Sequence, residues 1–578
     1  MDRHTRAPQQ PHPARRWLAP GLAVLLAAGC ASVAPAPSAD PGHAAAIALL
    51  EQGQARQAAQ QLEALAATAR NGQRHALLAD AAFAWREAGD EARARSLLAQ
   101  VEARRVGGAS RARLALLRAE LALADGQVPV PLDGDPALLP TGQQARWQLA
   151  QGAALEAAGD AIGAAAARAR ADAGLQGQAR EDNRRAIERL LSGLDDATLG
   201  ARAAALPAGE PLYNFTARAL LRRGLPLPRP FDRDPAWNFD DRPPAAADGY
   251  RPPRRLAVLL PLSGPLSTAA ASVRDGLLAG YYGETRQRPE IRFYDTAGTP
   301  AGALAAYARA TAEQADFVIG PLSREEVGAV FGQASAGVPT LALNRGNVPP
   351  PPGHATFSLA PEEDGVAAAD YLVAREHRRV LVIAANDENG QRAAEAFARR
   401  LAERGGEVAA TVRVGEQPGD VSAQLVQAAA AGADAVFLAM RGPQARALVP
   451  QLALAGLGAK TRVATSQLTS GTGRAEEDAV LDGIVYPTEA WPVRGAAQLP
   501  SAQRAAELVP TARGPAARLF AFGYDAWRIS AYLERLATRA DGELRGATGT
   551  LRLDGFGAVL RQPAWATFSG GTPVPLRD

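Results

Sequence analysis

The second half of the chain begins with an apolar run that shows no alternation, residues 256–260. Such a run predicts a strand covered on both faces, as in a parallel sheet. A polar turn with Ser263, Gly264 and Ser267 follows. Apolar residues then recur every fourth place over 269–281, which predicts a helix capped by Ser267 or Thr268. Strand, turn and helix predict the first unit of an open α/β sheet, in which ligands gather at the carboxyl ends of the strands.

The same pattern continues and then restarts after a crossing at 354–360. We predict strands at 291–296, 316–319 and 338–344 in the first set, and at 380–384, 408–414, 434–439, 462–465 and 483–486 in the second. Ser323 and Glu326 form a capping-box pattern that opens a helix. The chain therefore predicts two α/β lobes with a cleft between them. We expect lobe 1 at about 254–358 and 490–545, and lobe 2 at about 359–489 and 546–578, with a hairpin edge at 546–554.

Small residues recur at a regular interval in the first part of the chain. Four of them precede a glycine by seven residues: Ala46, Ala82, Ala119 and Gly152, before Gly53, Gly89, Gly126 and Gly159. The copies lie 36, 37 and 33 residues apart, which resembles the tetratricopeptide repeat, a pair of packed helices. Pro129 and Pro131 interrupt the third copy, because proline ends a helix. We predict a repeat-like helical domain over 42–223; a generic Ala-rich bundle is the alternative.

A proline-rich linker separates the two halves at 224–253. Trp237 and Phe239 lie inside it. Large aromatic side chains favour packing against a neighbour, so we expect a fixed strap rather than a free hinge.

The N-terminus has the pattern of a secretory signal, with Arg15 and Arg16 before a short apolar run at 18–28. The run ends at Cys30, the single cysteine of the chain, and the small residues before it resemble the bacterial lipobox. That resemblance implies a signal peptide at 1–29, a lipid on Cys30 and an extended tether at 30–41. Ala31, in place of Asp, implies sorting to the outer membrane. An ordinary signal with an incidental cysteine is the alternative.

Composition narrows the possible chemistry. Lys and Arg number 63 against 60 Asp and Glu, without blocks of like charge, so we predict no nucleic-acid partner. The six histidines have no ligand spacing, and we predict no metal and no cofactor.

Five short stretches carry a resemblance to a known fold. They are LLPLSGPL at 259–266, VIGPL at 318–322, LALN at 341–344, FGYDA at 522–526 and TGTL at 548–551. They resemble the type 1 periplasmic-binding-protein fold and, within it, the LpoA-type outer-membrane lipoprotein activators of class A penicillin-binding proteins. The order of lipobox, helical repeats and α/β lobes is also similar. The resemblance implies a lipoprotein that binds a class A penicillin-binding protein and stimulates its transpeptidase activity.

A periplasmic solute-binding protein for an amino acid or a peptidoglycan fragment is the second hypothesis. The residues that would then face the cleft are Ser263, Gly264, Ser267, Ser323, Asn344 and Tyr524. The competing interpretation, which we favour, is turn and capping chemistry, because Ser, Gly and Asn predominate in turns.

An enzyme is the third hypothesis, and we predict against it. Tyr524 and Asp525 are expected in the first turn of a helix, where Asp is common. Glu362 and Glu363 follow Pro361, another helix-start pattern. Neither pair comes with a nucleophile or a metal ligand, so the requirements for a catalytic site are not met.

Overall fold

A computed structural model describes residues 40–333, 337–539 and 542–576. The predicted signal peptide and Cys30 lie outside these ranges. The chain divides into two compact units, Met1–Ser110 and Arg111–Asp578. The helical domain expected over 42–223 is therefore divided between them.

The first unit consists of helix pairs joined at the predicted glycines. Its helices are α1 (Pro41–Glu51), α2 (Ala55–Thr68), α3 (Asn71–Glu87) and α4 (Glu91–Leu98), followed by η1 (Ala103–Arg105) and the start of α5 (Gly108–Ala124). Gly53 and Gly89 have φ angles of 80° and 82°, a conformation that glycine adopts without steric cost. The predicted small residues Ala46 and Ala82 are fully buried. Helix pairs with glycine turns are confirmed here.

The second unit opens with the rest of the helical region. After α5 come η2 (Pro136–Leu138), α6 (Thr141–Ala157), α7 (Ala161–Ala171), η3 (Asp172–Gly174), α8 (Gly177–Ser192), α9 (Asp196–Ala205) and α10 (Leu212–Arg222). A Cβ on Gly152 would lie 2.9 Å from Arg168 Cγ, so a small residue is needed where α6 meets α7. Residues 125–135, which contain Pro129 and Pro131, form no helix, and the predicted break in the third pair is confirmed.

The linker at 224–253 is a strap packed on lobe 1, as predicted. Trp237, Phe239 and Tyr250 are buried in the same apolar core as the strands of that lobe. The Arg242 guanidinium donates to the carbonyl of Ser530 at 2.9 Å. The strap is thereby fixed at several points along its length.

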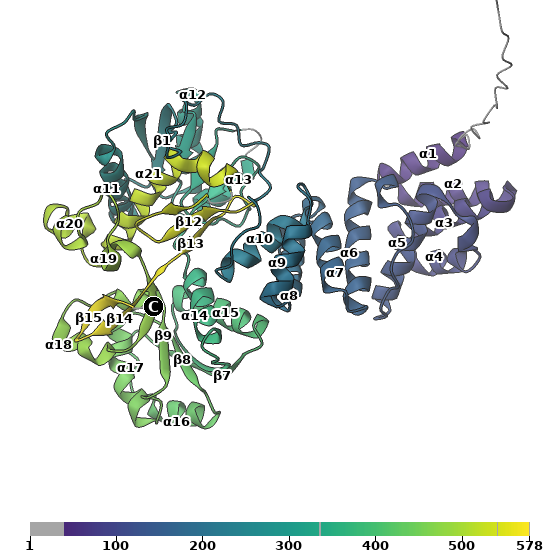
Figure 1. The fold of residues 1–578 in the computed structure, drawn as a ribbon. Coiled ribbons are helices and arrows are strands. Elements are labelled where there is room, and N and C mark those ends of the chain that lie inside the picture. Colours follow the sequence, from purple (N-terminus) through teal and green to yellow (C-terminus); the bar gives the residue numbers. More distant parts are fainter. Residues whose placement is uncertain (1–39, 334–336, 540–541, 577–578) are drawn as a thin grey trace, which may run out of the picture. The chain divides into compact units, whose positions relative to one another are not determined.

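Lobe 1 contains a parallel sheet with strand order β2-β1-β3-β4-β5. The strands are β1 (Arg255–Leu260), β2 (Glu290–Asp295), β3 (Phe317–Ile319), β4 (Thr340–Ala342) and β5 (Ala355–Thr356). Helices α11 (Ser267–Gly283) and α21 (Ala516–Thr538) cover one face; α12 (Pro300–Ala312) and α13 (Arg324–Gln333) cover the other (Figure 1). The first strand is buried on both faces, as its apolar run predicts.

Two glycines set the close approach of α11 and α21. A Cβ on Gly276 would lie 1.8 Å from the Phe520 carbonyl oxygen, and one on Gly523 would lie 1.9 Å from the Val273 carbonyl oxygen. Only glycine leaves room for backbone on backbone at this crossing.

Lobe 2 contains a seven-stranded sheet of order β15-β14-β10-β9-β8-β6-β7, parallel except at β14 and β15. Its strands are β6 (Arg379–Ala385), β7 (Glu407–Val414), β8 (Ala435–Ala439), β9 (Thr461–Ala464), β10 (Val485–Thr488), β14 (Ala564–Ser569) and β15 (Thr572–Pro575). Helices α14 (Pro361–Val373) and α15 (Glu388–Glu403) pack on one face; α16 (Ser422–Ala430) and α17 (Gly442–Leu454) pack on the other (Figure 1). The shorter elements η4 (Ser466–Thr469), α18 (Ala475–Asp478) and η5 (Ala479–Leu481) complete it.

The predicted lobe boundary at 546 is wrong. Helices α19 (Ala490–Arg494) and α20 (Ala502–Leu508) and the turn η6 (Pro510–Ala512) lead into α21, and a three-stranded sheet follows: β11 (Leu544–Arg545), β12 (Thr550–Leu553) and β13 (Val559–Gln562). Leu551, Leu553 and Val559 are buried in the core of lobe 1. The chain returns to lobe 2 only at β14, because the apolar side of this hairpin packs against lobe 1.

Candidate functional site

The predicted turn after β1 is held by a carboxylate of the same lobe. The Ser263 hydroxyl donates to Asp295 Oδ2 at 2.6 Å, and the backbone N–H groups of Leu262 and Ser263 donate to Oδ1 at 2.9 and 3.2 Å. The Ser263 hydroxyl is the main cause of the lowered pKa of Asp295. Gly264 has a φ of 79°. Ser263 and Gly264 thus serve the turn.

The capping role predicted for Ser267 or Thr268 is wrong. Helix α11 begins at Ser267, and its N-cap position is occupied by Leu266, whose side chain makes no capping hydrogen bond. The backbone N–H of Ser267 donates to the Gly264 carbonyl at 3.2 Å. Ser267 is itself the first helical residue, so its hydroxyl does not occupy the capping position.

Ser323 and Asn344 also make local hydrogen bonds. The backbone N–H of Ser323 donates to Glu326 Oε2 at 2.8 Å, and the N–H of Glu326 donates to Ser323 Oγ at 3.3 Å, so the predicted capping box is confirmed. The Asn344 amide donates to the Leu322 carbonyl at 3.0 Å and ties the ends of β3 and β4 together.

The prediction that Tyr524 and Asp525 lie at a helix start is wrong. Both lie in the middle of α21, and both are buried. The Tyr524 hydroxyl donates to the Ala497 carbonyl at 2.9 Å. The Asp525 carboxylate accepts the N–H groups of Ala547 and Thr548, each at 2.7 Å, and the Thr548 hydroxyl at 2.6 Å. Asp525 therefore holds the turn before β12, and Tyr524 belongs to the core of lobe 1.

Ser263, Ser323, Asn344 and Tyr524 thus make hydrogen bonds within lobe 1, and a role of the six residues in binding a solute stays a prediction. A different set of side chains meets between the lobes, with arginines from lobe 1 and carboxylates from the start of α14 and the end of β10 in lobe 2. We call this set the interlobe ion cluster: Arg345, Arg518, Arg561, Glu363, Asp364 and Glu489.

Arg561 of β13 is at the centre of the cluster. Its side chain is 1% exposed, and its nitrogens lie 3.7 Å from Glu363 Oε2 and 3.6 Å from Asp364 Oδ1. Burial lowers the pKa of Arg561, but the carboxylates of Glu363 and Asp364 outweigh it, so the pKa is raised and the residue stays charged. Arg345 also donates to Glu363 Oε1, at 2.6 Å.

Two further contacts extend the cluster. Arg518 Nε lies 3.4 Å from Glu489 Oε1, and both side chains are largely buried. The second oxygen of Asp364 accepts the backbone N–H and the hydroxyl of Ser466 at 2.9 and 2.5 Å. Charges of opposite sign therefore face each other across the lobes in a medium of low dielectric constant, where their attraction is strong.

Glu362 and Glu363 do lie at a helix start behind Pro361, as predicted. Glu362 pairs with Arg392 at 2.8 Å inside lobe 2, whereas Glu363 faces lobe 1. The sequence did not single out Arg561 or Asp364. The one available pattern was the polar residue inside the strand VLRQ at 559–562, which does not reveal what faces it.

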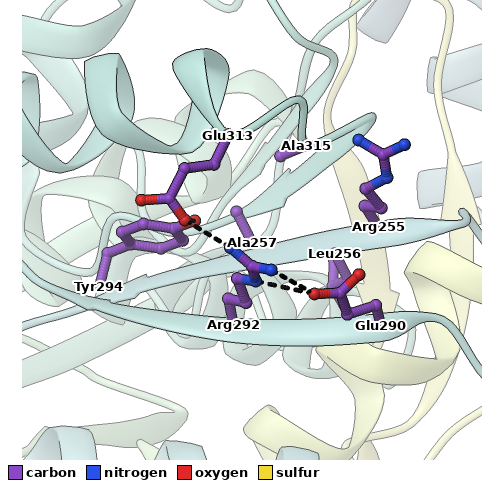
Figure 2. A pocket seen from close by; sticks show the side chains of 8 residues that line it. All are labelled: Arg255, Leu256, Ala257, Glu290, Arg292, Tyr294, Glu313 and Ala315. Carbon is purple, nitrogen blue, oxygen red and sulfur yellow. Dashed lines mark hydrogen bonds and ion pairs between the residues drawn. The ribbon is translucent and has the colours of Figure 1, made fainter.

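Figure 2 shows the side chains that line a shallow pocket at the amino ends of β1 and β2. Arg292 bridges Glu290 at 2.6 Å and Glu313 at 2.8 Å, and the Tyr294 hydroxyl donates to Glu313 at 2.8 Å. This edge of the sheet is opposite to the carboxyl edge where ligands gather in α/β sheets. Its side chains satisfy one another.

A second pocket, of about 260 Å³, lies at the carboxyl ends of β6, β8 and β9. Its polar lining comes from Asp387, Asn389, Arg441, Thr465 and Gln467. All of its lining residues belong to lobe 2.

Two searches restricted to the described residues gave negative results. No group of three or more His, Cys, Asp or Glu in these ranges is arranged to hold a metal ion. No helix in the same ranges has the length and apolar character needed to cross a bilayer.

The chain is similar to proteins named penicillin-binding protein activator LpoA. It is 27% identical to the one from Photobacterium profundum over 354 residues, which cover 56% of this chain and 57% of the relative. The one from Vibrio vulnificus is 26% identical over 348 residues, covering 54% and 57%. The matched region spans little more than half the length of these curated relatives.

A solved structure of Haemophilus influenzae LpoA is similar in fold, with a TM-score of 0.50, 19% identity and coverage of 90% of this chain and 98% of that one. The likeness confirms the predicted fold class, a helical region followed by a two-lobed periplasmic-binding-protein-like α/β domain. The family model described as LppC putative lipoprotein matches residues 250–571, more than half of the chain. The chain belongs to the LppC putative lipoprotein family.

Proposed function

We propose that this chain is an outer-membrane-anchored periplasmic lipoprotein that binds a class A penicillin-binding protein and stimulates its transpeptidase activity. Membership of the LppC family and the names of the curated relatives support this proposal. The α/β module is the docking element, and the helical region gives it reach across the periplasm.

The interlobe ion cluster is the observation that carries the proposal. A solute-binding protein has to part its lobes to admit and release its solute. Here Arg561 pairs with Glu363 and Asp364 across the interlobe contact, and parting the lobes would break these ion pairs. A cleft closed in this way favours a rigid docking module over a solute trap.

Binding to the synthase tests the proposal directly. The full chain is mixed with a purified class A penicillin-binding protein, and we expect co-elution and a several-fold increase in the rate of peptide cross-linking. A penicillin-binding protein without a glycosyltransferase domain is the specificity control. Folded protein that binds no class A enzyme would refute the proposal.

Binding of a solute is the alternative function. The pocket in lobe 2 favours it, because polar groups converge there at the carboxyl ends of three strands. Thermal unfolding of the full chain with amino acids and muropeptides distinguishes the two functions. A solute at 100 times its Kd would add about 2.7 kcal/mol of stability. A saturable shift with one solute would favour the alternative.

The lipid anchor on Cys30 is a separate prediction. Cys30→Ala should move the protein from the outer-membrane fraction to the soluble periplasm and abolish incorporation of labelled palmitate, since a thiol is the acceptor of the lipid. Ser32→Ala, two residues away, is the matched control and should leave both unchanged. Retention of the Cys30 variant in the membrane would contradict the prediction.

A further inference from the structure

Four arginines gather where the helical region meets lobe 2, in the second unit. A small pocket, with about 20 Å³ open to the centres of water-sized molecules, lies between α8, α10 and α15. Its charged lining consists of Arg218, Arg222, Arg223, Arg400 and one carboxylate, Glu188. We call this the α8–α10–α15 pocket.

The arginines differ in how fully they are paired. Arg400 forms an ion pair with Asp370 at 2.8 Å. Arg223 donates to the carbonyls of Leu191 and Leu194 near the end of α8. Arg222 pairs with Glu188 at 3.0 Å and is also close enough to Glu403 and Asp554 to feel their charges, and its side chain is one-third exposed at the mouth of the pocket. Arg222 thus has donors left for a ligand.

Arg218 lies deeper, with a side chain that is 12% exposed. One guanidinium nitrogen pairs with Asp554 at 2.6 Å, and another lies 3.6 Å from Glu188. Its Nε atom is buried and has no hydrogen-bond partner among the described residues. A buried donor without a partner is costly, so an acceptor entering the pocket would gain from it.

Glu188 reports the electrostatic potential inside the pocket. Burial raises the pKa of its carboxyl. Arg222, Arg218 and Arg400 together lower that pKa by more than burial raises it, so the net shift is downward. Arg404, one turn after Arg400, gives the same indication: burial lowers its pKa, Asp370 opposes this, and the charges of Arg400 and Arg223 lower it again. At the Glu188 carboxyl the arginines therefore outweigh the effect of burial.

We propose that the α8–α10–α15 pocket binds an oxyanion, a carboxylate or phosphate group, through Arg222 and Arg218. Guanidinium groups match the geometry of both groups by paired hydrogen bonds. Glu188 competes for the same donors. Both arginines belong to α10, and Arg400 of α15 lines the same pocket. This proposal does not rest on the proposed function.

Isothermal titration calorimetry on the full chain tests the proposal, with inorganic phosphate and acetate as probes at constant ionic strength in chloride. We expect saturable binding of at least one probe, and the stronger one identifies phosphate or carboxylate as the natural group. Arg222→Gln should weaken binding about tenfold or more, since it removes a charged hydrogen-bond donor. Glu188→Gln should strengthen binding several-fold, because it removes the competing carboxylate.

Arg185→Gln is the matched control, since Arg185 lies on α8, the helix of Glu188, and is half exposed and paired with Asp182. It should bind both probes like the native protein. Binding of neither probe, or equal affinity in the native and Arg222→Gln proteins, overturns the proposal. If Arg222→Gln does not fold, the opposite shift expected for Glu188→Gln decides, and an unchanged affinity there overturns it.

Discussion

Arg561 is a charged side chain that is almost fully buried and pairs with carboxylates of the other lobe. Replacing one partner of a buried ion pair leaves the other charge without compensation, which costs about 3–5 kcal/mol. We therefore expect Arg561→Met to lower the free energy of unfolding by about that amount in urea denaturation at pH 7, although Met has similar volume.

Arg545, on strand β11 of the same three-stranded sheet, is the control because its side chain is 90% exposed and it pairs with Glu543 only at 4.0 Å. Arg545→Met should change the free energy of unfolding by less than about 0.5 kcal/mol. Equal effects of the two substitutions would mean that the cluster contributes no stability.

The contact between Ser263 and Asp295 gives a prediction about pH. Asp295 has a lowered pKa in the folded protein, so its contribution to stability is present above its unfolded pKa of about 4 and is lost as the pH falls through the folded value. Ser263→Ala should raise the pKa of Asp295 toward its ordinary value, measured by NMR of ¹³C-labelled Asp carboxyls. Thr268→Ala, which alters an exposed hydroxyl of α11, should leave it unchanged.

At the scale of single residues, the sequence could predict interactions between side chains that are close together in the chain. The Ser323–Glu326 capping box depends on residues three apart, and it is confirmed. Asp525 was misplaced because its partners Ala547 and Thr548 come 22 and 23 residues later. Nothing in the local pattern of α21 indicates a turn that approaches it from outside.

At the scale of elements, the turn between β12 and β13 fastens the helical region to lobe 1. Its Phe556 packs against Phe215 with ring centroids 4.5 Å apart, and the guanidiniums of Arg218 and Arg184 lie 4.2 and 4.9 Å from its ring centre. Asp554 of the same turn pairs with Arg218 at 2.6 Å. An aromatic ring and an ion pair therefore form one joint.

Phe556→Ala should loosen this joint. We expect a loss of about 2–3 kcal/mol in the free energy of unfolding, less than for a fully buried Phe because the ring is only partly buried. Limited proteolysis should also cut faster in the strap at 224–253. Leu454→Ala, at an 81% exposed position, is the control. Unchanged cleavage and stability would show that the turn does not hold the helical region.

Strands and helices could be predicted well because hydrophobic periodicity is local. The unbroken run at 256–260 became β1, and the glycines at 53 and 89 end helices as their spacing predicted. The hairpin of β12 and β13 was assigned to the wrong lobe because alternation shows which face is apolar, not which core receives it. Lobe membership depends on contacts between distant segments.

At the scale of the whole chain, the two lobes of the second unit are joined by three crossings, at 357–360, at 489 and at 563. Hinge closure around a ligand needs crossings that bend and an interface that opens. The interface here holds arginines against carboxylates, and the turn carrying Phe556 and Asp554 fastens the helical region to lobe 1. We therefore expect one closure of the lobes, with or without small molecules.

Spin labels measure this closure directly. Tyr282 of lobe 1 and Leu454 of lobe 2 are 70% and 81% exposed, and both are replaced by Cys in a Cys30→Ala background, which removes the only native thiol. We expect a single narrow distance distribution that amino acids and muropeptides do not shift. Arg561→Met in the same background is the matched comparison: it should broaden the distribution, because the interface has lost its central cation. If the doubly labelled protein that keeps Arg561 showed two resolved label-to-label distances, or if that distance shifted by several ångströms on adding a solute, the cleft would open and close around that solute.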